Sequence, residues 1–352
     1  MKVPVSNYHV GQHRLSNDER NEFNARLDMI MNSGVLRNGE YSRNLASNLV
    51  DMTGYRYAIP TDSGTSALAI IIAYLNREHR IKKVLAPAYT FQATYNAVAQ
   101  ALPRVLVGER GQSNASITSL KLSTNFDANL NINPAEEEIE WADLIVTVGL
   151  AGAHCDFNTD RALVVEDACQ DWITKPYTGN HRAISFDPSK TVSGLNAGGA
   201  ILTDNKDLAI YASHAIFNAH QQLGWVYDEL EPCFGKRSIT EIDALHVSLM
   251  LESVNKRLEL RRALLAAYKE GLGDLLVGSD FDTHDAQKAL VNIPEMSSTY
   301  YRTVQEKLGT LRSSVRQVYQ HDHLPGCLFS LPMSERYAPD SELISRVISA
   351  FK

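Results

Sequence analysis

One lysine in this chain of 352 residues stands where covalent chemistry is possible. Residues 185–190 read Ser-Phe-Asp-Pro-Ser-Lys, and Gly198-Gly199 leads into the apolar run 200–202. This pattern indicates a strand, a tight turn that ends at Lys190 and a glycine-rich return. A lysine on such a turn can hold an aldehyde cofactor as a Schiff base, if burial or a cationic neighbour makes its amine nucleophilic. A solvated surface lysine is the alternative.

Three further segments could do chemistry together with this lysine. Ser63-Gly64-Thr65 precedes an apolar helix, so free amides, two hydroxyls and the helix dipole could bind an anion; an ordinary N-cap is the alternative. Phe91 follows a strand and could lie flat on a planar ligand, or it could pack in the core. Glu166-Asp167 ends a strand, where a carboxylate could pair with a protonated ring nitrogen or cap a following helix.

The rest of the pattern predicts the elements that must position these residues. A helix is expected from Ser16, as N-cap, to Met31, and further helices over 67–75, from Phe91 to 101, and over 241–268. Strands are expected at 57–60, 83–86, 104–107, 144–148, 162–165 and 327–331, and 111–122 is polar enough for a loop. Strands that alternate with helices predict a parallel sheet covered on both faces, with ligands at the carboxyl ends of the strands.

Composition narrows the class of protein. The 44% hydrophobic content is typical of a globular chain, and the length suits a large domain plus a smaller one. A formal net charge of −7 argues against nucleic acid or an anionic membrane as the main partner. We therefore expect small-molecule partners.

The cysteines and the first residues bear on location and metals. Cys155, Cys169, Cys233 and Cys327 are far apart without a CxxC pair, which indicates a reduced, intracellular protein. The sequence offers no signal-peptide core and no membrane span of about 18 apolar residues, so we expect a cytoplasmic protein. The segments 154–156 (His-Cys-Asp) and 321–323 (His-Asp-His) are too bunched for ligands to converge, and solvated loops are expected there.

Together the motifs make the chain resemble the DegT-like nucleotide-sugar aminotransferases, pyridoxal-phosphate enzymes of fold type I. The resemblance covers nearly the whole chain. The motifs that carry it are 33–39 (SGVLRNG), 62–68 (DSGTSAL), 87–94 (PAYTFQAT), 166–170 (EDACQ), 185–190 (SFDPSK) and 198–200 (GGA). It implies an α/β fold with a large cofactor-binding domain, residues 1–240, whose central sheet is mostly parallel. A smaller C-terminal α/β domain, residues 241–352, would follow.

The resemblance also assigns roles to single residues. Lys190 would carry the cofactor and shuttle protons, and Asp167 would keep the ring nitrogen protonated. Phe91 would stack on the ring and Gln170 would contact its hydroxyl. The phosphate would be held by Gly64, Thr65 and Ser185.

Several positions depart from the family pattern. Asn196-Ala197-Gly198-Gly199 replaces the usual GEGG, so an acidic residue is lost, and Asp187 stands where histidine is frequent. Residues 236–241 read KRSITE instead of NyRmsE, in which the asparagine reaches the phosphate of the partner subunit. We expect Lys236, or its neighbour Arg237, to replace that contact in a homodimer with shared active sites.

The resulting prediction is an aminotransferase that moves an amino group from L-glutamate to a keto group of a nucleotide-linked sugar, through pyridoxal and then pyridoxamine phosphate. A pyridoxal-phosphate enzyme acting on another carbonyl substrate is one alternative. A dehydratase of the same family is another, although it would have histidine in place of Lys190. A non-catalytic or regulatory relative of the same fold is the third.

Overall fold

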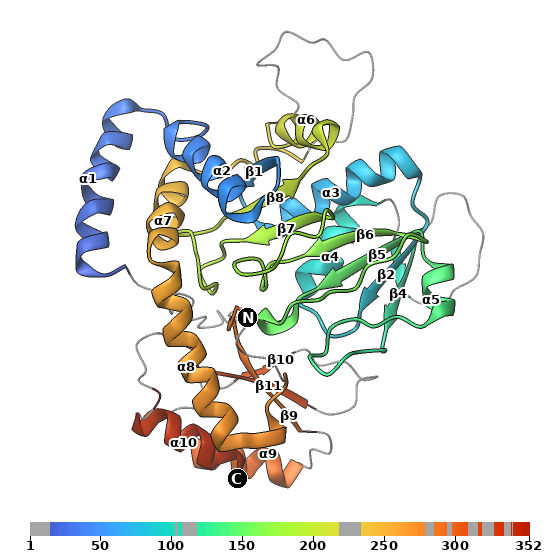
Figure 1. Ribbon diagram of the computed structural model, residues 1–352, viewed down its shortest axis with the longest axis vertical. Coiled ribbons are helices and arrows are strands. Elements are labelled where there is room, and N and C mark those ends of the chain that lie inside the picture. The colour runs from blue at the N-terminus through green and yellow to red at the C-terminus, as the bar shows by residue number, and fades with distance from the viewer. Residues whose placement is uncertain are drawn as a thin grey trace, which may run out of the picture.

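The computed structural model describes residues 15–102, 105–107, 118–217, 234–278, 285–293, 298–308, 316–318, 327–333, 339 and 341–352. Figure 1 shows a large sheet with its helices in the upper part of the view. The long helix α8 (Val254–Leu272) leads from there to a smaller group of strands and helices.

The first described elements are helices α1 (Asn17–Ser33) and α2 (Glu40–Thr53). Ser16 is the N-cap of α1, as predicted: its hydroxyl accepts from the Glu19 amide, and Glu19 returns a bond to the Ser16 amide. Gly34 ends the helix with φ 69, a left-handed conformation that suits glycine.

Within the described residues, eight strands form the large sheet in the order β1-β8-β7-β6-β5-β2-β4-β3. Their pairing makes seven of them run in one direction, whereas β8 is antiparallel to both of its neighbours. The predicted, mostly parallel sheet is therefore confirmed. The strands are β1 (Tyr57–Thr61), β2 (Lys83–Pro87), β3 (Val105–Val107), β4 (Thr118–Ser123), β5 (Leu144–Val148), β6 (Leu163–Asp167), β7 (His181–Ser185) and β8 (Gly199–Thr203).

Helices cover both faces of the large sheet. On one face α3 (Gly64–His79), α4 (Gln92–Ala101) and α6 (Lys206–Ala215) share a core with the strands. On the other face lie α2, α7 (Glu241–Glu252) and α5 (Glu136–Trp141). Successive strand residues point to opposite faces of the sheet. Ala183 packs in the core with α3, whereas Ile184 packs in the core with α2 and α7. Helix α3 is apolar on all sides because it is sandwiched, and Ile70, Ile71 and Ile72 are each 0% exposed.

The prediction of one long helix over 241–268 is wrong. Helix α7 ends at Glu252 and α8 begins at Val254, with Ser253 between them at φ −109 and ψ 13. The Ser253 hydroxyl donates to Glu19 at 2.6 Å and accepts from Arg257 at 2.9 Å. A serine whose side chain finds such partners competes with the helical backbone.

The predicted loop at 111–122 is wrong where the structure describes it. Residues 118–123 form β4, which pairs in parallel with both β2 and β3. Thr118, Leu120 and Ser123 are buried. This polar segment is a strand because the strands on either side supply its backbone hydrogen bonds. Residues 111–117 lie outside the described part of the chain.

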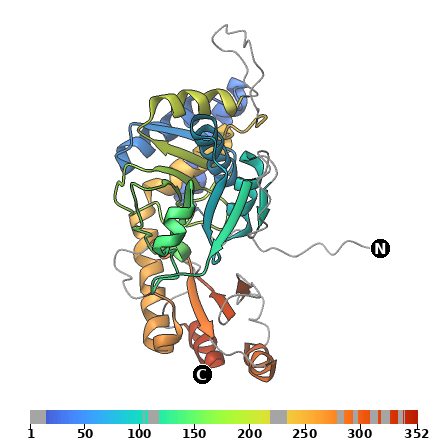
Figure 2. The ribbon, with the colours of Figure 1, turned by 90° about the vertical axis from the view of Figure 1, so that its right-hand side faces the viewer.

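A second, smaller sheet lies below the large one in Figure 2. It is antiparallel in the order β10-β11-β9, with strands β9 (Ala289–Ile293), β10 (Arg316–Val318) and β11 (Cys327–Leu331). The predicted strand at 327–331 is confirmed. The one-turn helix η2 (Gly273–Leu275) and helices α9 (Ser298–Leu308) and α10 (Glu342–Phe351) accompany this small sheet.

Helices α7 and α8 contribute to two different hydrophobic cores. Val247 and Met250 of α7 pack with Leu45 and Leu49 in the core of the large sheet, whereas the end of α8 packs in the core of the small sheet. A domain boundary between residues 240 and 241 stays a prediction. Among the described residues, no helix is long and apolar enough to cross a membrane.

Candidate active site

The carboxyl ends of four parallel strands, β1, β2, β6 and β7, meet at one edge of the large sheet, as the alternating pattern predicts. A cavity of about 190 Å³ opens there. Seven of the predicted site residues line it, although they come from segments far apart in the sequence. These residues are Gly64, Thr65, Phe91, Asp167, Gln170, Ser185 and Lys190.

Lys190 lies on a turn that follows β7, as the sequence indicates. Its amide donates to the Asp187 carbonyl at 2.8 Å. The Asp187 carboxylate in turn accepts from the Ser189 amide at 2.9 Å and hydroxyl at 2.6 Å. The backbone of Phe186 closes the turn against Gly194 and Gly198. Asp187, one of the departures from the family pattern, therefore shapes the turn that presents Lys190.

Asp167 is the last residue of β6 and is only 7% exposed. Its Oδ2 accepts from the Thr94 hydroxyl at 2.7 Å, and its Oδ1 accepts from the Cys169 amide at 3.3 Å. The Thr94 hydroxyl also lies 2.7 Å from that of Thr90. Residues 168–180, all of them described, form no helix, so Asp167 is not a helix cap. Its carboxylate faces the cavity instead.

Glu166, one residue earlier, points to the other side of the sheet. Its Oε2 lies 2.6 Å from Arg182 Nε and 3.2 Å from Lys175 Nζ, both buried. Burial alone would raise the pKa of Glu166, but these two cations lower it below its usual value. The alternation of strand side chains thus separates a structural carboxylate from one in the cavity.

The turn at 63–65 serves both of the roles that its sequence left open. Ser63 caps α3, because its hydroxyl accepts from the Ser66 amide at 3.2 Å, while Gly64 and Thr65 line the cavity at the helix N-terminus. Steric crowding requires glycine at position 64. A Cβ on Gly64 would lie 2.5 Å from Cys169 Sγ and 2.9 Å from Ser185 Cβ.

Phe91, which follows β2, and Gln170, which follows β6, also line the cavity. Phe91 precedes α4 and is 62% exposed, so the alternative of core packing is wrong. Gln170 is buried, and its Oε1 accepts from the Ala151 amide at 3.2 Å in the one-turn helix η1 (Leu150–Gly152). Phe91 thus offers an open ring face, and the side chain of Gln170 is anchored.

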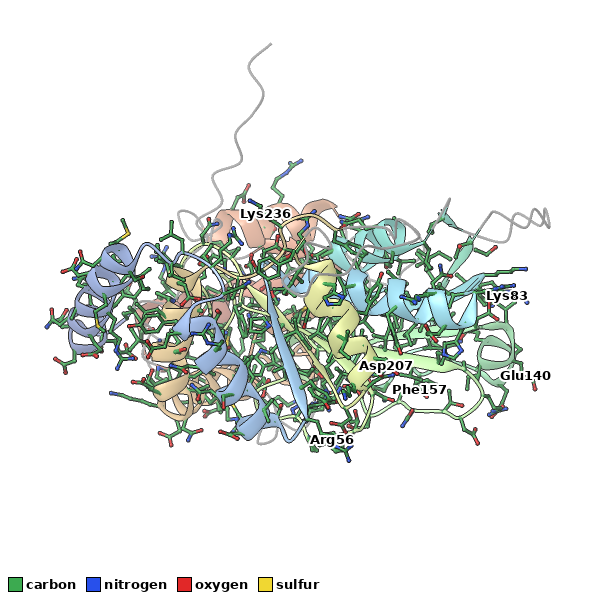
Figure 3. The ribbon with its side chains drawn as sticks, turned by 90° about the horizontal axis from the view of Figure 1, so that it is seen from above. Arg56, Lys83, Glu140, Phe157, Asp207 and Lys236 are labelled. Carbon is green, nitrogen blue, oxygen red and sulfur yellow. The ribbon has the colours of Figure 1, made fainter. Side chains whose placement is uncertain are left out.

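Lys236 is the one predicted site residue that the described cavity lining does not include. It is exposed, and Figure 3 labels it. Its neighbour Arg237 is tied to the same chain through Asp62, at 3.3 Å. Whether Lys236 reaches the phosphate of a partner subunit stays a prediction.

Sequence reasoning missed several residues of the site. Thr90, Thr94 and Cys169 belong to the quoted motifs and line the cavity, but no role was assigned to them. Burial, reinforced by the nearby charge of Asp167, raises the pKa of the Cys169 thiol well above its usual value. Lys288, which precedes β9 of the small sheet, also lines the cavity, and no local pattern marks it.

The histidine-containing segment 154–156 is not part of this cavity lining. His154 Nε2 is 3.9 Å from Asp285 Oδ1, and Cys155 is buried. Over the residues described, no group of three or more His, Cys, Asp or Glu side chains is arranged to hold a metal ion. The segment 321–323 and Cys233 lie outside the described residues.

The donor set fits pyridoxal phosphate. A lysine amine and a buried carboxylate face the same cavity, which suits an aldehyde and a protonated ring nitrogen. Hydroxyls and amides at the N-terminus of α3 suit a phosphate, and the exposed Phe91 ring suits a planar ligand.

Comparison with known proteins assigns the chain to a family. Residues 17–324 match the model of the DegT/DnrJ/EryC1/StrS aminotransferase family. The 3-oxo-glucose-6-phosphate:glutamate aminotransferase of Bacillus subtilis is 29% identical over 211 residues, 55% of this chain and 43% of that protein. The chain thus matches less than half the length of this relative.

A second relative matches over a longer region, and a solved structure shares the fold. The UDP-2-acetamido-2-deoxy-3-oxo-D-glucuronate aminotransferase of Pseudomonas aeruginosa is 26% identical over 70% of this chain and 69% of its own. A Bacillus subtilis protein solved with bound PMP superposes with a TM-score of 0.74, at 22% identity over 96% of this chain and 82% of that one. The chain belongs to the DegT/DnrJ/EryC1/StrS aminotransferase family.

Proposed function

We propose that this protein transfers an amino group from L-glutamate to a keto group of a nucleotide-linked sugar. The observation that carries the proposal is the convergence of Lys190, Asp167 and the N-terminus of α3 on one cavity. Lys190 argues against a dehydratase, which needs histidine at this position, and the buried Asp167 argues against a non-catalytic relative.

Lys190 and Asp167 are the proposed catalytic residues. When bound, pyridoxal phosphate supplies an aldehyde that takes up the amino group and a ring that stabilises negative charge at the carbon that loses a proton. The Lys190 amine holds the cofactor and then moves that proton. The negative charge of Asp167 keeps the ring nitrogen protonated, and the hydroxyl of Thr94 holds this carboxylate at 2.7 Å.

The remaining residues bind and orient the cofactor in this proposal. Gly64, Thr65 and Ser185 hold the phosphate, with free amides of α3 adding their positive dipole. Phe91 covers one face of the ring, and Gln170 contacts the ring hydroxyl.

Two ammonium groups, of Lys190 and Lys288, line the cavity together with the carboxylates of Asp167 and Asp187. Since Lys190 and Asp167 are assigned to the cofactor, Lys288 is a cation that can bind a negatively charged group of a substrate. The names of the two relatives include a sugar phosphate, glutamate and a UDP-linked sugar, all of which carry negative charge. A nucleotide-linked keto sugar fits this charge, and a keto-sugar phosphate tests how far the preference extends.

Two half-reactions test the function. We expect the purified protein with pyridoxal phosphate to be yellow and to lose the visible band when glutamate alone is added. About one 2-oxoglutarate should be released for each bound cofactor. A UDP-linked 3-oxo sugar should then restore the band, with 3-oxo-glucose 6-phosphate as the comparison. If no amino acid changes the band while the cofactor is bound at Lys190, the non-catalytic alternative replaces this proposal.

We further propose a cytoplasmic homodimer in which Lys236 of each chain completes the phosphate site of its partner. An obligate interface of this kind buries well over about 2,000 Å². Mixing Lys190→Ala chains with Lys236→Ala chains should restore about a quarter of wild-type activity, because half of the dimers are mixed and each contains one intact site. No recovery in demonstrably mixed dimers, or a fully active monomer in sedimentation, would contradict a shared site.

A further inference from the structure

Residues 285–288, which lead into β9 of the small sheet, contact loops at the carboxyl edge of the large sheet. The amides of Asp285 and Lys288 donate to the carbonyls of Gly152 and Ala151, both at 2.9 Å. The Asp285 carboxylate accepts from the amides of Ile173 at 2.6 Å and Thr174 at 2.9 Å. This segment therefore belongs to the active-site edge, although in sequence it belongs to the small sheet.

Gln287 is the member of this segment that holds the loop of Lys190. Its Oε1 accepts from the Thr191 amide at 3.0 Å and from the Thr191 hydroxyl at 3.1 Å. Its Nε2 donates to the Ser189 carbonyl at 2.9 Å. The two partners flank Lys190 on either side. Gln287 is 5% exposed and Thr191 is 0% exposed, so the two bonds between these residues are protected from water.

Gln287 is itself held in place by a buried arginine. Arg261 of α8, 1% exposed, donates to the carbonyls of Ala286 at 2.9 Å and Gln287 at 2.7 Å. A third bond reaches the Met333 carbonyl at 2.7 Å. A planar guanidinium with several fixed donors suits such bracing. The backbone that carries Gln287 is thus anchored from outside the large sheet.

We propose that Gln287 is a positioning residue that fixes the backbone on both sides of Lys190, and so sets how fast the Lys190 amine captures the cofactor. This inference rests on the proposed role of Lys190. A lysine side chain has four rotatable bonds, so the position of its backbone decides whether the amine is aligned for attack. A shift of about 1 Å in a reacting group costs roughly 10²-fold in rate.

The test compares Gln287→Ala, Gln287→Glu and the control Tyr268→Phe. The control removes a buried hydrogen bond of 2.9 Å, from Tyr268 to the Pro332 carbonyl, elsewhere around the small sheet. Each cofactor-free protein is mixed with pyridoxal phosphate. The rate of capture is followed by the visible band, and the adduct is trapped by borohydride and located by peptide mass. Hydrogen exchange of amides 189–194 is measured without cofactor.

Gln287→Ala should slow capture at Lys190 by roughly 10- to 100-fold and speed exchange at 189–191. Gln287→Glu keeps the acceptor for Thr191 but replaces the donor to Ser189 by a second oxygen that faces the Ser189 carbonyl, so capture should again be slower than in the wild type. Tyr268→Phe should capture cofactor at the wild-type rate. Wild-type capture and exchange in Gln287→Ala would overturn the inference.

Two outcomes separate this inference from the proposed function. If the wild type traps its cofactor at a residue other than Lys190, the proposed function fails and takes this inference with it. If the wild type traps it at Lys190 and Gln287→Ala behaves like it, only this inference fails. Should Gln287→Ala not fold, Thr191→Val, which removes one bond to Gln287, must slow capture by a measurable factor or the inference is wrong.

Discussion

Asp167 and Lys190 line the same cavity, but different parts of the molecule hold them. Asp167 ends a central strand that pairs with Val148 of β5 and Ala183 of β7, and a hydroxyl of α4 binds its carboxylate. Lys190 lies on a half-buried turn beyond β7, and the bonds of Gln287 reach it from the small sheet. The carboxylate is thus part of the large sheet, whereas the lysine depends on contact between the two sheets.

This difference predicts how perturbations separate. Changes near the small sheet should alter the reactivity of the lysine while leaving the environment of Asp167 intact. Changes at the strand ends should do the reverse.

Lys190→Ala should abolish covalent capture of the cofactor and lower turnover by at least about 10⁴-fold, since a covalent catalyst is lost. The protein should still fold, because Lys190 is half-buried on a turn. Borohydride trapping with peptide mass and single-turnover kinetics measure the two effects. Lys206→Ala, at an exposed position on α6, is the control. Substantial turnover by Lys190→Ala would sink the assignment.

Asp167→Ala should lower turnover by roughly 10³-fold or more, because an unprotonated ring is a poor electron sink. Asp167→Asn should preserve the shape of the site but not the activity. Thr94→Val removes one hydrogen bond to the carboxylate and should cost only about tenfold. In all three variants Lys190 should still be trapped by borohydride. Loss of trapping would show that the two sides of the site are not held separately.

Lys288→Ala should raise the KM for an anionic substrate by roughly tenfold, with a smaller change in kcat, since a charge that binds the ground state is removed. Glutamate and the sugar acceptor are titrated separately, and the substrate whose KM rises is the one that Lys288 contacts. Lys288→Arg should stay near wild type because it keeps the charge. Unchanged KM values for both substrates would exclude Lys288 from substrate binding.

The two ion pairs that Glu166 makes with Lys175 and Arg182 should make the free energy of unfolding depend on pH. The pKa of Glu166 is lowered in the folded state from its ordinary value of 4.5, so the unfolded chain takes up this proton first. The stabilisation is complete when the pH is above the ordinary pKa of Glu166. It is lost as the pH falls through the lowered pKa of the folded state. Each unit of lowering contributes about 1.4 kcal/mol.

Thermal unfolding between pH 7 and pH 3 measures this dependence. Glu166→Gln should be less stable at pH 7 and should lose less stability on acidification than the wild type. The exposed Glu140, labelled in Figure 3, gives the control Glu140→Gln, which should follow the wild type. An acid profile of Glu166→Gln parallel to that of the wild type would rule out the linkage.

Much of the fold could be predicted because its signals are local. The capping box of Ser16 and Glu19, the apolar run of α3 and the strand at 327–331 each lie within a short window of sequence. Strand β4 was missed because its residues are polar and its partners, β2 and β3, supply the reason for its conformation. The break at Ser253 was missed because Glu19 lies more than two hundred residues away.

Local sequence patterns are enough to place the reactive residue types at the strand ends, including Lys190, Asp167 and the turn at 63–65. Periodicity and turn residues specify such positions within one element. The residues around them depend on long-range packing: Thr94 binds the carboxylate, Gln287 binds the lysine loop and Lys288 lines the cavity. Gln287 lies 96 residues after Thr191, and no local pattern encodes a bond that forms only where two sheets meet.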